Sequence, residues 1–106
     1  MHRGLQRMHR ECNECAAACL REEEVKMMAR CITLDVDCAA IWQRAVAAMA
    51  RDSEHVTAIC SLCGDICDSC ADECSKHAME HCQRCAEACK RSATARRSMA
   101  LGASKN

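Results

Sequence analysis

The spacing of the cysteines is the feature that most constrains this chain of 106 residues. Within each local group, successive cysteines are three, four or seven residues apart, the intervals that place side chains on one face of an α-helix. The alternation of three and four reproduces the inward seam of a helix bundle. The 13 cysteines are Cys12, Cys15, Cys19, Cys31, Cys38, Cys60, Cys63, Cys67, Cys70, Cys74, Cys82, Cys85 and Cys89. Thiols therefore occupy the positions that Leu and Ile usually fill.

The composition also favours helices. Ala, Glu, Arg, Lys, Gln and Met dominate, proline is absent, and glycine occurs only at Gly4, Gly64 and Gly102. No segment alternates apolar and polar residues for long, and β-branched residues never cluster, so strands are not expected.

Charge runs mark the breaks between helices. The acids Glu22 to Glu24 suit the first turn of a second helix, and Asp52 or Ser53 can cap a third. We predict one domain over residues 1–106. The helices are expected near residues 3–20, 23–50, 53–76 and 78–98, with a frayed tail over 99–106.

Short turns between long helices force antiparallel neighbours. The sequence therefore predicts the all-α class, as an antiparallel, up-down-up-down four-helix bundle with a cysteine-lined core. The alternative is a pair of extended helical hairpins that pair only in an oligomer.

Several protein classes are disfavoured. An odd number of cysteines leaves at least one thiol outside any disulfide framework. No hydrophobic signal-peptide core lies within residues 1–11, and no stretch is long and apolar enough for a membrane span. We therefore expect a cytoplasmic protein, whose reduced thiols serve metal binding or redox chemistry. The formal net charge is 0, which gives no field to recruit nucleic acid or an anionic membrane.

A cysteine stripe can be ordinary core packing, because cysteine is a small and commonly buried side chain. The run from Cys60 to Cys74, however, fills five successive inward positions without a Leu. Each such position gives up about 1 kcal/mol of hydrophobic stabilisation relative to Leu. A chemical role for the thiols is therefore favoured.

The chemistry of the ligands discriminates among metals. Four cysteine pairs have the spacing of zinc knuckles: Cys12/Cys15, Cys60/Cys63, Cys67/Cys70 and Cys82/Cys85. Each pair continues with a further cysteine four residues later, in helix-forming sequence without the aromatic residues common in zinc turns, and the Cys-Pro of ferredoxin motifs is absent. Soft thiolates select Cu(I). If each ion takes two thiolates and each thiolate serves two ions, capacity approaches roughly 13 ions per chain.

The stretches 60–74 and 80–89, with His77 between them, resemble the copper storage proteins, four-helix bundles that hold many Cu(I) ions along a cysteine-lined interior. Residues 12–38 resemble the first two helices of that family. The resemblance implies a homo-tetramer and kinship with the cytosolic branch. Two features depart from the pattern: Trp42 stands where another cysteine is expected, and Ser92, Ala93 and Arg96 follow Cys89 in place of further thiols.

The rise per residue of an α-helix predicts how far each thiol lies from the end of the bundle. Cys19, Cys74 and Cys82 are expected within roughly 5 Å of the end where the first and third turns meet, with Cys38 and Cys60 roughly 20–25 Å deep. Beyond them an apolar plug is expected from Leu5, Met8, Trp42, Ala45, Met49 and Val56.

The thiol-rich end is expected to be the mouth through which copper passes. In heptad register, Met27 and His77 point inward, whereas Met28 and His81 flank the seam. These four side chains are candidate low-affinity ligands for incoming metal. The alternative is that the methionines fill core space and the histidines lie at helix ends without a metal role.

The sequence thus predicts a Cu(I) storage or sequestration protein and not an enzyme, since no nucleophile and base can be distinguished from the stripe. Its partners would be copper ions and a copper chaperone or small-molecule copper ligand. The alternatives are a zinc or iron–sulfur structural module used for protein interaction, or a thiol redox protein with one low-pKa cysteine pair.

Overall fold

The computed structural model describes residues 2–104, and it describes side-chain burial for residues 8–96 and 98. The chain forms α1 (His2–Leu20), a short 3-10 helix η1 (Val25–Met28), α2 (Ala29–Ala50), α3 (Val56–Ser75) and α4 (Glu80–Ser104). Within residues 2–104 there is no β-strand. The predicted all-α class is confirmed.

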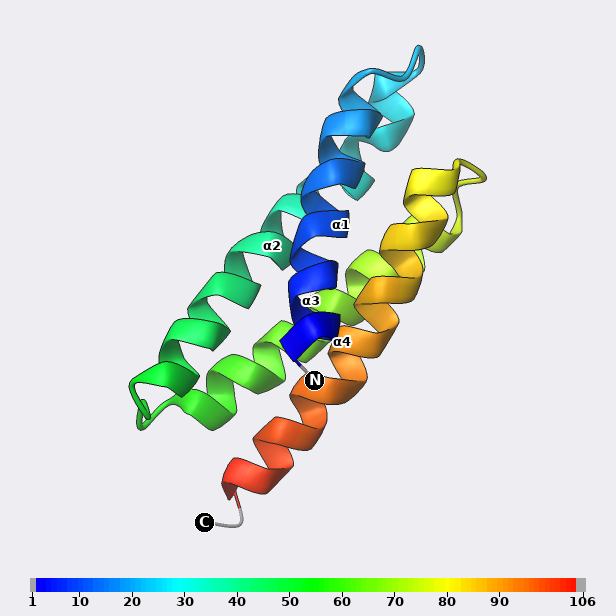
Figure 1. Cartoon of the computed structure of the whole chain (residues 1–106). Coiled ribbons are helices and arrows are strands. Elements are labelled where there is room, and N and C mark those ends of the chain that lie inside the picture. Colours follow the sequence, from blue (N-terminus) through cyan, green and yellow to red (C-terminus); the bar gives the residue numbers. More distant parts are fainter. Residues whose placement is uncertain (1, 105–106) are drawn as a thin grey trace.

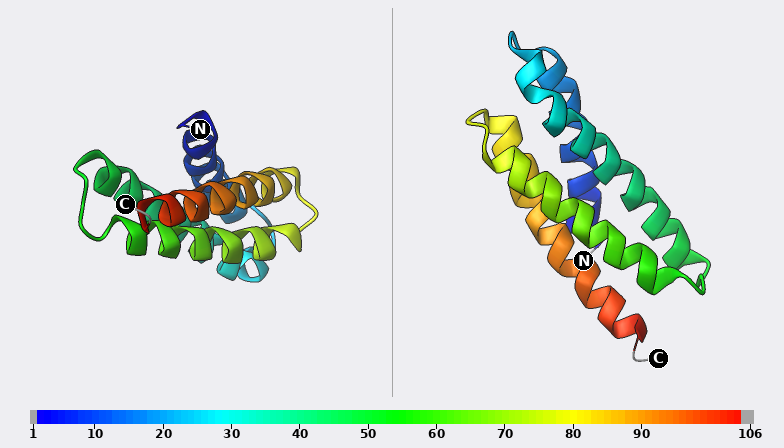
Figure 2. Two further views of the ribbon diagram at one scale, coloured as in Figure 1. Left: turned by 90° about the horizontal axis from the view of Figure 1, so that it is seen from below. Right: turned by 180° about the vertical axis from the view of Figure 1, so that it is seen from behind.

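The four long helices form an antiparallel bundle (Figures 1 and 2). Each helix packs against its neighbours in sequence, and α1 also packs against α4, which closes the ring. The bundle is elongated, with principal extents of 49 × 20 × 18 Å. The turns between α1 and α2 and between α3 and α4 lie at the same end (Figure 1). The up-down-up-down prediction is therefore confirmed.

The first break differs from its prediction. The second helix was expected to begin near residue 23, but α2 begins at Ala29 and has no acidic residue in its first turn. Residues 21–24 form an irregular turn that leads into η1. Glu23 and Glu24 are exposed around the mouth, whereas Glu22 is half-buried and its Oε1 atom lies 3.1 Å from Nε2 of His81.

The second break also differs in detail. Neither Asp52 nor Ser53 is the N-cap of α3, which begins at Val56 after His55. Asp52 adopts a positive φ of 54°, and the Ser53 hydroxyl accepts a hydrogen bond from the His55 backbone N–H at 3.1 Å. These two residues therefore build the connecting turn, because Asp tolerates the left-handed region and Ser can bond to the backbone two residues ahead.

The fourth helix is longer than expected. It continues to Ser104, so the expectation of a frayed tail from residue 99 is wrong for residues 99–104, while 105–106 lie outside the described residues. Met99, Ala100, Leu101 and Ala103 are all good helix formers, and only Gly102 interrupts them.

The core is narrow because small side chains fill the positions around the thiols. Buried alanines surround the cysteines on all four helices: Ala16, Ala39, Ala45, Ala48, Ala71, Ala86, Ala88 and Ala93. Small residues let the helix backbones approach closely, so the cysteine sulfurs of facing helices meet along the axis of the bundle.

Candidate metal centre

All thirteen cysteines are free thiols in the described part of the chain. Each is buried, with no more than 1% of its surface exposed. They belong to one continuous cluster in the interior of the bundle. The structure therefore places every predicted ligand on the inward face of its helix.

Sulfur atoms from different helices lie within contact distance at successive levels. Cys31 on α2 and Cys74 on α3 bring their Sγ atoms to 3.2 Å. Other such Sγ–Sγ distances are 3.2 Å for Cys38–Cys67, 3.4 Å for Cys12–Cys89, 3.6 Å for Cys12–Cys85, 3.8 Å for Cys15–Cys82 and 4.0 Å for Cys19–Cys82. Because a thiolate sulfur has several lone pairs, an array this dense can bridge neighbouring soft ions.

Four sets of four ligand atoms each lie within 4.8 Å of one another. The sets are Cys12/Cys38/Cys70/Cys89, Cys15/Cys19/Cys31/Cys82, Cys12/Asp35/Cys70/Cys85 and Cys15/Cys31/Asp35/Cys74. Five residues belong to two sets each, so the sets merge into one array. Cys60, Cys63 and Cys67 belong to none of them.

Asp35 is a core residue that our sequence reasoning missed. Its side chain is fully buried. Its Oδ1 atom accepts hydrogen bonds from the thiols of Cys70 at 3.1 Å, Cys85 at 3.2 Å and Cys74 at 3.5 Å. The signal was present in the sequence, because residue 35 lies four residues after Cys31 and three before Cys38 and therefore continues the stripe on α2.

The environment of Asp35 favours its neutral form. Burial raises the pKa of this carboxyl group to about 9, and the neighbouring Cys70 and Cys15 add to the shift. At neutral pH the copper-free core therefore holds a protonated carboxyl among thiols. This residue places a carboxyl oxygen and an exchangeable proton among the thiols at the centre of the array.

His81 joins the array to the surface at the mouth. Its Nδ1 atom lies 3.5 Å from the Sγ atoms of both Cys15 and Cys82. Its Nε2 atom lies 3.1 Å from Oε1 of Glu22, in the turn after α1. Burial opposes the charged imidazole, but hydrogen bonds with Cys15 and Glu22 outweigh it and raise the pKa of His81. The glutamate holds the ring so that Nδ1 faces the thiols.

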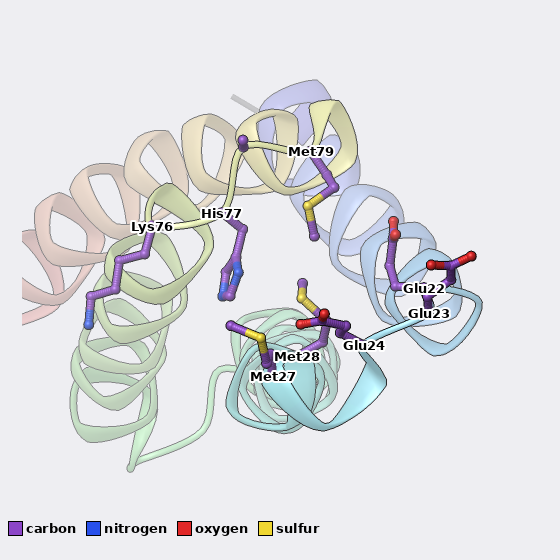
Figure 3. Close-up of a pocket in the computed structure, with 9 residues that line it drawn as sticks. Glu22, Glu23, Glu24, Met27, Met28, Lys76, His77 and Met79 are labelled. Atoms are coloured by element: carbon purple, nitrogen blue, oxygen red, sulfur yellow. The ribbon is translucent and has the colours of Figure 1, made fainter.

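A pocket of about 420 Å³ opens between the two turns at the mouth. Figure 3 shows Met28, His77 and Met79 pointing into the space between the turns, with Glu22 and Glu23 at its edge. Met79 was not a predicted site residue. It lies in the turn before α4, where helical periodicity gives no indication of side-chain direction.

The two adjacent methionines exchange their expected places. Met28 is buried, with 3% of its surface exposed, whereas Met27 is 68% exposed and lines only the rim. The prediction that Met27 points inward is therefore wrong. The heptad register of Cys31 does not extend back to Met27, because Val25–Met28 is a 3-10 helix with a different angular step per residue.

His77 is held by a buried carboxylate. Its Nε2 atom lies 2.9 Å from Oε2 of Glu73, one turn earlier on α3. Oε1 of the same carboxylate lies 2.9 Å from Nη1 of Arg30 on α2 and 3.7 Å from Nζ of Lys76. The hydrogen bond from His77 lowers the pKa of Glu73, and Arg30 reinforces it against the effect of burial. This ion cluster ties α2 to α3 beside the pocket.

The end of the bundle opposite the mouth, called the closed end below, contains the predicted apolar residues whose side chains are described. It also contains one charged side chain. Met8 and Ala45 are fully buried, while Trp42, Met49 and Val56 are half-buried against the cluster. Met8 Sδ also accepts contacts from the Cys12 and Cys38 thiols at 3.5 Å each. Leu5 lies outside the residues whose side chains are described.

Arg96 is a buried charge at this end. It belongs to a charged stretch with Arg91 and Arg97 that ordinary solvation would expose, but Arg96 is 0% exposed. It lies seven residues after Cys89, with the buried Ser92 between them, so it continues the inward stripe of α4. The plug at this end is therefore not wholly apolar.

No helix within residues 2–104 is long and apolar enough to cross a membrane. The donor set of the interior is predominantly thiolate sulfur with added thioether, imidazole and carboxylate groups. Soft donors of this kind favour Cu(I) over hard cations.

Comparisons with known proteins agree with this chemistry. A cysteine-rich protein of Bacillus subtilis, YhjQ, is 47% identical over 55 residues, an alignment that covers 52% of this chain and about half (51%) of that protein. Copper storage protein 3 of B. subtilis in its apo form superposes with a TM-score of 0.86 at 44% identity, covering 92% of this chain and 93% of that one. A Cu(I)-bound structure of the B. subtilis protein gives a TM-score of 0.87 at 44% identity, covering 92% of both chains.

A third solved structure comes from another genus. It is a cytosolic copper storage protein of Streptomyces lividans with five coppers, which superposes with a TM-score of 0.88 at 33% identity. The superposition covers 93% of this chain and 88% of that one. The copper storage protein family profile matches residues 2–101. By its cysteine array, its fold and this match over nearly its whole length, the chain belongs to the copper storage protein family.

Proposed function

We propose that this chain stores Cu(I) by binding many ions to the thiolates that line its bundle. The observation that carries the proposal is the single buried array of 13 free cysteines, in which sulfurs from facing helices approach to 3.2–4.0 Å. Burial excludes water and oxidants from the bound ion. A store of this kind needs many equivalent ligands and no separate catalytic group.

The overlap of the four ligand sets favours Cu(I) over zinc. Zinc takes four ligands in a closed tetrahedron, and Cys12, Cys15, Cys31 and Cys70 each belong to two of the sets. Separate tetrahedral ions would compete for these shared residues. Two-coordinate Cu(I) ions can instead share them through bridging thiolates. We therefore expect a capacity near one ion per cysteine, roughly 13 per chain.

Copper is proposed to enter at the mouth. Met28, His77 and Met79 line the pocket, Met27 stands on its rim, and His81 connects the pocket to Cys15 and Cys82. Neutral thioether and imidazole ligands hold Cu(I) less strongly than thiolates, so they can pass the ion inward. Met27 is exposed and His77, Met79 and His81 are half-buried, so a donor in solution can reach them, whereas Met28 lies deeper.

The setting of the protein follows from the same features. We place it in the cytoplasm, where thiols stay reduced, in line with the Streptomyces relative that is described as cytosolic. A copper chaperone or a small-molecule copper ligand would deliver the metal. Membership of the copper storage protein family supports assembly into a homo-tetramer, with the exposed Val36 on α2 and Leu62 on α3 as candidate interface residues. We assign no enzymatic reaction to the array.

Anaerobic titration of the fully reduced protein with Cu(I) tests the storage function. Bathocuproine disulfonate, a competing Cu(I) chelator, reports free ion. We expect tight binding to continue to roughly 13 equivalents per chain. Saturation at three or four equivalents, or preferential retention of Zn²⁺ when both ions are present, would contradict storage and favour a zinc module. Multi-angle light scattering of the copper-free and copper-loaded forms measures the oligomeric state.

A further inference from the structure

The thiol array ends at a buried cation. The stripe on α4 runs Cys82, Cys85, Cys89, Ser92 and Arg96 with steps of three and four, so Arg96 occupies the place of a ligand. Its side chain is fully buried. Burial of a guanidinium group is costly unless negative charge compensates it, and Arg is rarely buried without a charged partner. An apolar residue would close the bundle at lower cost.

The groups around Arg96 come from the other helices at the closed end. Its Nη1 atom donates to Sδ of Met49 on α2 at 3.5 Å. Burial raises the pKa of Cys60, while a hydrogen bond with Cys67 and burial raise that of Cys63. In both cases the charge and the hydrogen bond of Arg96 act in the opposite direction and favour the thiolate. The packing of α3 on α4 places the guanidinium beside these sulfurs. Ser92 Oγ lies 3.6 Å from Cys67 Sγ, and in this antiparallel pair Arg96, one turn after Ser92, is level with Cys63, one turn before Cys67.

Cys60 and Cys63 differ from the thiols nearer the mouth. They lie on one helix, three residues apart, and belong to none of the four-ligand sets. An i, i+3 pair can hold one Cu(I) between two sulfurs. Binding of one Cu⁺ then releases two thiol protons to solvent and leaves a complex of charge −1. Neither sulfur belongs to a four-ligand set, so this site has fewer neighbouring ligands than those nearer the mouth to neutralise that charge by sharing additional copper ions.

We propose that Arg96 is the built-in counter-cation of an anionic bis-thiolate Cu(I) site formed by Cys60 and Cys63 at the closed end of the array. The proposal rests on the proposed storage function, because it presupposes that the chain binds Cu(I). Nearer the mouth, bridging ions balance the thiolates. At the closed end, where thiols are few, the protein supplies one positive charge of its own.

Substitution of Arg96 tests this role in a Cu(I) competition assay. Wild type, Arg96→Leu and Arg96→Lys are loaded to saturation without oxygen and then titrated with bathocuproine disulfonate. Arg96→Leu is expected to release one ion per chain at a roughly 10- to 100-fold lower chelator concentration, because that ion loses a charged partner. Arg96→Lys should retain this ion, because it keeps the charge. Arg91→Leu removes the same charge from the exposed face of α4 and should match wild type.

A second pair of variants separates a charge effect from a structural one. In a Cys60→Ser/Cys63→Ser background, Arg96→Leu should cause no further change in copper retention. The copper-free Arg96→Leu protein should melt no lower than wild type, because a buried charge has been removed. Three results would overturn the proposal: equal retention by Arg96→Leu and wild type, an undiminished effect of Arg96→Leu in the double-serine background, or loss of the ion in Arg96→Lys. A wild-type protein that binds no Cu(I) would contradict the storage function itself.

Discussion

The Asp35 carboxyl group and the Cys70 thiol meet in the centre of the bundle, with Oδ1 and Sγ 3.1 Å apart. Asp35 comes from α2 and Cys70 from α3, and Cys85 of α4 reaches the same oxygen at 3.2 Å. One acidic group thus accepts hydrogen bonds from two other helices. Its state of protonation affects the stability of the copper-free bundle.

The pH dependence of copper-free stability follows from Asp35. Its pKa rises to about 9 on folding, so between pH 5 and pH 8 the folded protein binds a proton that the unfolded chain has released. Stability therefore falls as pH rises, by at most about 1.4 kcal/mol per pH unit. Urea unfolding of the reduced, copper-free protein across this range should show the decline. Asp35→Asn, which cannot ionise, should flatten it, and an equal slope in both proteins would refute the assignment.

Cysteines at different depths should contribute unequally to capacity. Cys70 belongs to two ligand sets and lies 3.9 Å from Cys74 and 4.0 Å from Cys85, whereas Cys60 belongs to none. Cys70→Ser should therefore lower capacity by about two or three ions, and Cys60→Ser by about one. Cu(I) titration of the two variants, with circular dichroism to verify the helices, measures the difference. Equal losses would indicate independent sites and not a shared array.

Side chains at the mouth should control the rate of loading and leave capacity intact. Met28→Ala/His77→Ala removes two lining ligands from the pocket, and stopped-flow loading should slow by about tenfold or more. Met27→Ala should have a smaller effect, because Met27 lies on the rim. His55→Ala, an exposed histidine near the opposite turn, is the matched control. Unchanged loading in the double variant would argue against uptake at this end.

The Glu73 ion cluster should stabilise the fold near the mouth. His77 and Arg30 lower the pKa of the Glu73 carboxyl group. The contribution of this group to stability is therefore present above its unfolded pKa and is lost as pH falls through its folded pKa. Glu73→Gln should reduce the free energy of unfolding by about 1 kcal/mol at pH 7. The difference from wild type should shrink in acid. Glu87→Gln, which alters an exposed ion pair on α4, should change stability less.

The cysteine positions predicted the inward orientation of all 13 thiols, while the helix-forming composition and the short turns between helices predicted the fold class and the antiparallel topology. This succeeded because periods of three and four leave one consistent helical face on each segment. The same rule applied to Asp35 and Arg96, which continue the stripes of α2 and α4. Both side chains are charged, so ordinary solvation would expose them, and neither was predicted to lie in the core. Ordinary solvation preferences are thus overridden where a charged side chain has partners in the core.

Helical periodicity could not predict the mouth. Met27 and Met28 exchange their expected places because a 3-10 turn precedes α2, and Met79 lies in a turn with no helical register. The sequence also could not show which sulfurs meet, since Cys31 and Cys74 are 43 residues apart and come together only when α2 packs on α3. The sequence by itself determined which face of each helix carries the thiols. Tertiary packing decided how those faces align, and therefore which thiols can share an ion, because ligand geometry depends on distances between helices.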